Sequence, residues 1–150
     1  METPESRTDG DCFLVADRIG TRFTPDPVVD EVSRRDIRVV HGLPLGTGTL
    51  NEGRRYWHAW VEVTHRTPIP PELKAANPAF EHLGEEFVTE LVVDRSNGRD
   101  LVVPKAVYYN VGRLDERHVW RYTMDEASEN MRRYENFGPW VDGWEDMAEV

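Results

Sequence analysis

The chain has 150 residues, with 18 Lys and Arg against 28 Asp and Glu and a formal net charge of -10. This length predicts one domain with a single hydrophobic core, and the acidic balance argues against nucleic-acid binding, because phosphate contacts need clustered basic side chains. No apolar run approaches the ~20 residues that span a membrane, and the polar N-terminus is unlike a signal peptide. The single cysteine, Cys12, cannot form an internal disulfide and fits a reducing cytoplasm.

The first half of the chain predicts a helix and then strands. Asp11 is positioned to cap a helix that stops at Gly20. Phe13, Ala16 and Ile19 share one side of that helix, which should face the core. The expected elements are a helix over 12–20, a short helix over 28–35, a strand over 37–42, a Gly-rich turn and a strand over 55–65.

Proline-rich sequence over 64–85 interrupts the strands and is expected to be an inserted loop with one turn of helix. Beyond it, Pro104 suits the first position of a helix in which Val107 and Tyr108 should face inward. Thr123 opens a capping-box pattern at the start of the last helix. The expected elements are a strand over 87–94, a turn over 95–98, a short strand over 101–103, a helix over 104–112, an edge strand over 119–122 and a helix over 123–134.

Strands that follow one another without alternating helices favour an α+β fold over βαβ units. We therefore expect an N-terminal helix packed on an antiparallel sheet, with helices at the C-terminal end. The expected division of the chain is a flexible N-terminus over 1–10, a single domain over 11–140 that carries the insertion, and an acidic tail over 141–150.

The segment YWHAWVEV, residues 56–63, has the composition of a strand whose side chains alternate between two faces. One face is uniformly apolar and should pack in the core; it carries Trp57, Ala59, Val61 and Val63. The other face carries Tyr56, His58, Trp60 and Glu62. On that face we expect His58 to line a partly dry groove, where small changes in environment decide its charge. A histidine that is hydrogen-bonded on a half-exposed sheet face is the alternative interpretation.

Cys12 and Asp94 are the side chains best placed to act with His58. A cysteine attacks only as the thiolate, which a helix N-terminus and a nearby imidazolium stabilise, and Cys12 lies where the first helix begins. A structural cysteine buried as a small apolar group is the alternative. Asp94 ends the next strand, so antiparallel pairing with residues 55–65 would bring its carboxylate to the His58 ring and fix the imidazole tautomer. Ordinary turn chemistry is the alternative for Asp94.

The order of these residues and their local sequences resemble the transglutaminase-like branch of the papain-like cysteine enzymes. The resemblance covers residues 11–97 and rests on a cysteine at the start of the first helix, on HAWVEV at 58–63 and on VVD at 92–94. More loosely, the chain resembles small uncharacterised phage-encoded and bacterial proteins that share VVHG, HAWVE, DRSNG, a PKAVYY-type helix and a GPW ending.

The resemblance implies a transglutaminase-like or papain-like core with a catalytic triad. Cys12 would be the nucleophile, His58 the general base and then acid, and Asp94 the residue that orients His58. Tyr56 and Trp60 would bind substrate as walls of the groove, and the backbone N–H of Cys12 would be a donor to the oxyanion. The reaction would be hydrolysis or transfer of an amide bond in a peptide or protein through a thioester, without a cofactor.

A second hypothesis belongs to a different class: a non-enzymatic, phage-encoded interaction protein built on a degenerate triad fold. Its acidic surface would bind a host or virion protein. Trp140 and Trp144, in the C-terminal segment, would dock either on the domain or on that partner.

Two other sequence signals carry less weight. The five histidines do not fall at zinc-ligand spacings, and one cysteine rules out the common structural zinc sites, so no metal site is expected. The Gly-rich segment over 41–48 lacks the Lys and the Ser or Thr of a phosphate-binding loop. A mobile turn is the preferred interpretation of that segment, and a lid over the groove is the alternative.

Overall fold

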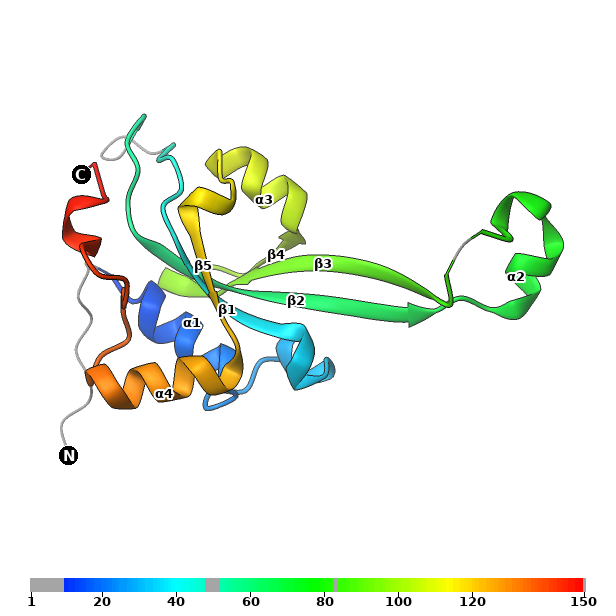
Figure 1. The fold of residues 1–150 in the computed structure, drawn as a ribbon, viewed down its shortest axis with the longest axis horizontal. Helices are drawn as coiled ribbons and strands as arrows, with labels where there is room; N and C mark the ends of the chain where they lie inside the picture. Colours follow the sequence, from blue (N-terminus) through cyan, green and yellow to red (C-terminus); the bar gives the residue numbers. More distant parts are fainter. Residues whose placement is uncertain (1–9, 48–51, 83, 150) are drawn as a thin grey trace.

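The computed structural model describes residues 10–47, 52–82 and 84–149, so most of the N-terminus expected to be flexible and part of the Gly-rich turn lie outside the described residues. Five antiparallel strands form one sheet in the order β4-β3-β2-β1-β5 (Figure 1). The strands are β1 (Ile37–Gly42), β2 (His58–Pro68), β3 (Glu86–Asp94), β4 (Leu101–Pro104) and β5 (Val119–Tyr122). The α-helices are α1 (Cys12–Gly20), α2 (Pro71–Ala76), α3 (Lys105–Gly112) and α4 (Met124–Tyr134). The short 3-10 helices are η1 (Val29–Glu31), η2 (Arg34–Asp36), η3 (Pro78–Phe80), η4 (Ser96–Gly98), η5 (Glu116–His118) and η6 (Trp144–Asp146).

This architecture confirms the expected α+β fold, with an N-terminal helix packed on an antiparallel sheet and a C-terminal helix. Helices cover the sheet on both faces (Figure 1). α1 and α4 lie on one face, where apolar side chains of α1 pack against Ala59, Val61 and Val63. α3 lies on the other face, over Val40 and Trp60. The face of β2 that carries His58 and Trp60 is therefore buried as well, with α3 packed over Trp60, and the expectation that this face lines a groove and is not part of the core is wrong.

β2 and β3 extend beyond the other strands as a two-stranded arm with α2 and η3 at its tip (Figure 1). Their pairing runs out to Pro68 opposite Glu86, whereas the β1 pairing with β2 ends at Ile37 opposite Val63. The proline-rich segment is thus only partly a loop, since its first residues continue β2 as far as Pro68. The prolines fall at the strand end and at the first turn of α2, where a missing N–H costs little.

Two further expectations about local structure are corrected. The helix expected over 28–35 is replaced by η1 and η2, because Val32 between them is extended, with φ -99° and ψ 158°. Val107 is 52% exposed and does not face inward. It shares the outer side of α3 with Val111, four residues later, while Tyr108 on the inner side packs against the sheet.

The C-terminal segment docks on the domain. Thr123 and Glu126 form the expected capping box at the start of α4. Trp140 is buried and packs with Val39 of β1, and the indole N–H of Trp57 donates to the Trp144 carbonyl at 2.8 Å. In the described part of the chain, no helix has the length and apolar character needed to cross a membrane.

Candidate active site

The antiparallel pairing of β2 and β3 brings His58 and Asp94 together. Val61 pairs with Val93, so continuing the register by one residue places Asp94 opposite Trp60. His58 is then the diagonal neighbour of Asp94 on the same face, within reach of a side-chain contact. His58 Nε2 lies 2.8 Å from Asp94 Oδ2, and both side chains are buried. The contact expected between these two residues is confirmed.

The Asp94 carboxylate has donors on both of its oxygens. On Oδ1 it accepts from the Ser96 backbone N–H at 3.0 Å and from the Ser96 hydroxyl at 2.6 Å. On Oδ2 it accepts from Tyr108 OH at 3.2 Å and from Arg99 Nη1 at 3.4 Å, in addition to His58. A carboxylate held by this many donors keeps one orientation, and it holds the imidazole in one orientation in turn.

Cys12, the first residue of α1, lies on the His58 side of this network. Its side chain acts on the His58 imidazole, because the hydrogen bond and the charge of Cys12 both raise the pKa of His58. Asp11 occupies the N-cap position but makes no side-chain cap hydrogen bond. Its Oδ1 instead accepts from the Asn97 backbone N–H at 2.7 Å, which ties the start of α1 to the turn that follows Asp94. Three side chains far apart in the sequence therefore converge at one end of the sheet.

The electrostatics of the pair favour a charged imidazole. Burial by itself would lower the pKa of His58, but the hydrogen bond to Asp94, together with the hydrogen bond and charge of Cys12, outweighs it and raises the pKa to about 9. Burial would raise the pKa of the Asp94 carboxyl, but the hydrogen bond and charge of His58 and the hydrogen bonds from Ser96 hold it well below its usual range. At neutral pH the two side chains form an imidazolium–carboxylate pair.

The two residues expected to bind substrate differ in their surroundings. Tyr56 is half-buried, with its ring centroid 6.0 Å from that of His58. Trp60 is 1% exposed, stacks on Tyr108 at a centroid distance of 5.1 Å and donates its indole N–H to Glu62 at 3.0 Å. The expectation that Trp60 walls an open groove is wrong, because α3 buries it; Tyr56 remains at the edge of the site.

Access to the thiol is narrow. Cys12 is 4% exposed, and the gap that it lines with Ala16, Trp60 and Ser96 leaves no water-sized space among the described residues. A reagent or substrate therefore reaches the thiol only when the segments around the site move apart.

A second histidine–carboxyl pair lies inside the core, on the face covered by α1 and α4. His41 Nε2 is 2.9 Å from Asp17 Oδ1, and both side chains are fully buried. Burial lowers the pKa of His41 to about 3 and raises that of Asp17 well above its usual value. Among the described residues, no hydrogen-bond partner reaches His41 Nδ1 or Asp17 Oδ2. Each member of this pair is therefore uncharged at neutral pH, whereas His58 and Asp94 carry opposite charges.

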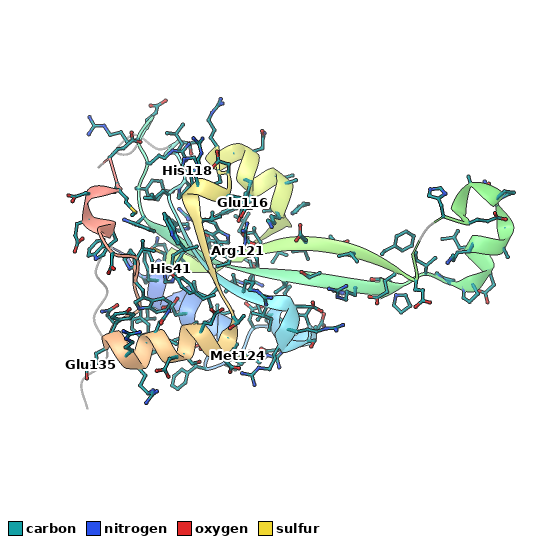
Figure 2. All side chains as sticks on the ribbon, in the orientation of Figure 1. His41, Glu116, His118, Arg121, Met124 and Glu135 are labelled. Carbon is teal, nitrogen blue, oxygen red and sulfur yellow. The ribbon has the colours of Figure 1, made fainter. Side chains whose placement is uncertain are left out.

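Glu62, the acid on the same face of β2 as His58, is fully engaged. Its donors are Trp60 Nε1 at 3.0 Å, Tyr109 OH, Arg121 Nε at 3.1 Å and Lys105 Nζ at 3.6 Å. Arg121 also pairs with Glu116 in front of α3 (Figure 2). Since cations and hydroxyls surround this carboxylate, it ties α3 and β5 to the sheet and has no free oxygen for acid–base chemistry.

Sequence reasoning missed the residues that hold Asp94. Ser96 follows Asp94 by two positions, the spacing at which an aspartate accepts from the backbone after it, so that contact could have been found. Tyr108 and Arg99 reach Asp94 only through the packing of α3 and the turn at η4. Asp17 lies four residues after Phe13, on the apolar side of α1, and this periodicity could have marked it as buried.

Comparisons with models of protein families, with curated proteins and with solved structures found no match to this chain. The function of the site is therefore inferred from its residues and their geometry.

Proposed function

We propose that the protein is a small cysteine enzyme that hydrolyses or transfers an amide bond of a peptide or protein, with Cys12, His58 and Asp94 as its catalytic triad. The observation that carries this proposal is the buried hydrogen bond of 2.8 Å between His58 and Asp94. The effect of Cys12 on the pKa of the same imidazole supports it. A nucleophile, a base and a residue that orients the base are the three parts that such catalysis needs.

The first half of the reaction forms a thioester. The Cys12 thiolate, stabilised by the positive charge of His58, attacks the amide carbonyl carbon and gives a tetrahedral intermediate. His58 then gives its proton to the departing amine as the C–N bond breaks. Asp94 holds the proton on Nε2 throughout, so that the other ring nitrogen exchanges the reacting proton.

The second half of the reaction releases the acyl group. Neutral His58 takes a proton from water or from an acceptor amine, which attacks the thioester carbonyl. The C–S bond breaks, the thiolate is restored, and His58 regains its positive charge. Water as the acceptor gives hydrolysis, and an amine gives transfer.

The start of α1 supports stabilisation of the oxyanion. The first N–H groups of a helix have no intrahelical partner, and Asp11 does not cap them with its side chain. The chain contains no glutamine, so a glutamine side chain cannot serve as donor. The backbone N–H of Cys12 is the donor that we assign to the oxyanion.

Alkylation of Cys12 tests the proposal, and because the chain has one cysteine the labelled site is unambiguous. Iodoacetamide should label Cys12 quickly at pH 6, where an ordinary thiol of pKa about 8.5 is almost wholly protonated. His58→Ala should slow the labelling by at least about tenfold, since it removes the imidazolium partner. His65→Ala, which changes an exposed histidine on the arm, is the matched control and should leave the rate unchanged.

Acyl transfer to the thiol provides a second readout. Incubation with p-nitrophenyl acetate should leave an acetyl group on Cys12, detected in the intact mass, and Cys12→Ser should abolish it. Labelling as slow as that of an ordinary thiol, with no effect of His58→Ala and no acetylated protein, would contradict the enzyme proposal.

One observation favours a second candidate function, the binding of a host or virion protein without catalysis. The arm formed by β2 and β3 projects from the domain (Figure 1), and Phe87 and Val88 on it are 44% and 55% exposed. A two-stranded ribbon is only marginally stable by itself, so docking against a partner would stabilise it. Slow and His58-independent alkylation would favour this function over the first.

A further inference from the structure

Arg99 is the cation placed at the outer side of the triad. The chain reverses at η4, where Asn97 and Gly98 have φ of 53° and 75°, and the Arg99 N–H donates back to the Ser96 carbonyl at 3.0 Å. This turn returns Arg99 to Asp94, with Nη1 3.4 Å from Oδ2. Half of the Arg99 side chain is exposed, whereas Asp94 beneath it is almost completely buried.

Asp94 does not depend on Arg99 for its position. Its carboxylate already accepts from His58, Tyr108 and both donors of Ser96, and the Arg99 contact is the longest of the set. A carboxylate offers about four lone-pair sites, so these shorter contacts occupy them. The charge of Arg99 is therefore not needed to build the triad.

Arg99 also keeps most of its donors open. A guanidinium has five N–H donors in a planar fork that matches a carboxylate, and among the described residues Arg99 pairs only with Asp94. Arg95, four residues earlier in the same turn, differs: Asp26 binds its Nε at 2.9 Å, and Asp100 binds its Nη1. In a chain with a net charge of -10, Arg99 is an open cation beside the proposed catalytic residues.

The charge of Arg99 also acts on Tyr56, whose ring centroid lies 6.0 Å from that of His58. Burial raises the pKa of Tyr56, the positive charge of Arg99 opposes that rise, and negative charge on Asp94 and Cys12 adds to it. An anionic group of a substrate bound over Tyr56 would therefore meet the Arg99 guanidinium.

We propose that Arg99 selects substrates that carry a carboxylate next to the amide under attack, such as a peptide with an acidic residue or a C-terminal carboxylate at that position. The proposal rests on the enzyme function proposed above, and it names the class of substrate. Recognition would be a charge-assisted, two-point contact between the guanidinium fork and the carboxylate.

Two alkylating reagents of similar size, one anionic and one neutral, test this assignment. Iodoacetate carries a carboxylate and iodoacetamide does not, so the ratio of their rate constants with Cys12 reports the local charge, while the fraction of thiolate cancels. Arg99→Gln should lower the iodoacetate-to-iodoacetamide ratio by about 3- to 10-fold, as expected for the loss of one nearby charge. Arg99→Lys should retain most of the ratio. Arg117→Gln, which removes an exposed cation paired with Asp115, is the control and should not change it.

The outcomes separate the two proposals. If both reagents label Cys12 quickly and Arg99→Gln leaves the ratio unchanged, the assignment of Arg99 is overturned while the enzyme function stands. If labelling of the unmodified protein is slow and independent of His58, the enzyme function fails, and the assignment of Arg99 fails with it.

Discussion

His58 and Asp94 form a buried pair at the end of β2 and β3 in which every oxygen of the carboxylate is occupied, with 2.8 Å between Nε2 and Oδ2. His41 and Asp17 form a pair of similar length, 2.9 Å, in the core, yet their outer polar atoms have no partners among the described residues. The first pair is charged because donors stabilise the carboxylate, and the second is neutral because burial without such donors disfavours charge. This difference leads to opposite expectations for substitution of the two aspartates.

Asp94→Asn should weaken the proposed active site without changing its shape. The amide cannot stabilise an imidazolium as the carboxylate does, so the pKa of His58 should fall from about 9 toward its usual value. An NMR titration of the His58 ring measures this change directly. Alkylation of Cys12 at pH 6 should slow by on the order of tenfold. Asp142→Asn in the tail should leave both quantities unchanged, and an unchanged His58 titration in Asp94→Asn would contradict the ion pair.

The His58–Asp94 pair should make the protein less stable at alkaline pH. The pKa of His58 is raised by folding, so its contribution is complete below the unfolded value near 6.5 and is lost as pH rises through about 9. The loss should amount to about 2–3 kcal/mol of unfolding free energy. Urea denaturation at pH 7 and pH 10, compared with that of His58→Gln, measures it. A parallel pH dependence in the two proteins would show that another group is responsible.

Asp17→Asn should stabilise the protein relative to the unchanged chain as pH rises. Folding raises the pKa of Asp17, so the folded carboxyl binds a proton that the unfolded one has released above about pH 4. An amide needs no proton and can still hydrogen-bond to His41, so the variant should gain about 1.4 kcal/mol per pH unit until folded Asp17 ionises.

Asp26→Asn is the matched control for Asp17→Asn. The hydrogen bond from Arg95 and the backbone N–H groups of Val28 and Val29 hold the pKa of Asp26 below its usual value despite burial. Its replacement should therefore destabilise the protein at neutral pH. Denaturation by urea from pH 5 to pH 8 measures the free energy of unfolding of both variants. If Asp17→Asn loses stability by an amount that does not depend on pH, Asp17 is ionised in the folded protein.

Removal of the tip of the arm should leave the domain intact. Replacement of residues 70–84 by Asn-Gly keeps the buried Ile69 and joins it to Glu85, whose carbonyl already accepts from the Ile69 N–H at 2.9 Å, through a two-residue turn that suits a hairpin. The α2 helix buries none of its own residues, so unfolding free energy should change by less than about 1 kcal/mol. The alkylation rate of Cys12 should not change. Loss of cooperative unfolding would show that the tip contributes to the core.

The sequence by itself determined most of the local structure. The capping-box residues of α4, the apolar spacing of α1, and the alternation along β2 depend on neighbours within a few positions, and each produced the expected element. Cys12 starts the first expected helix and Asp94 ends an expected strand, while His58 lies within the strand expected to pair with it. This order indicated that the three could meet, because the start of a strand and the end of its antiparallel neighbour lie at the same end of a sheet.

Only the tertiary structure decided how this site is enclosed. Trp60 and His58 share the face of β2 that would be solvated in an isolated sheet. α3, more than forty positions later in the chain, covers that face. The partners of Asp94 from Tyr108 and Arg99, and the pairing of His41 with Asp17, likewise depend on which elements pack together. Burial and charge are set by these long-range contacts, and local periodicity carries no information about which helix will cover which face.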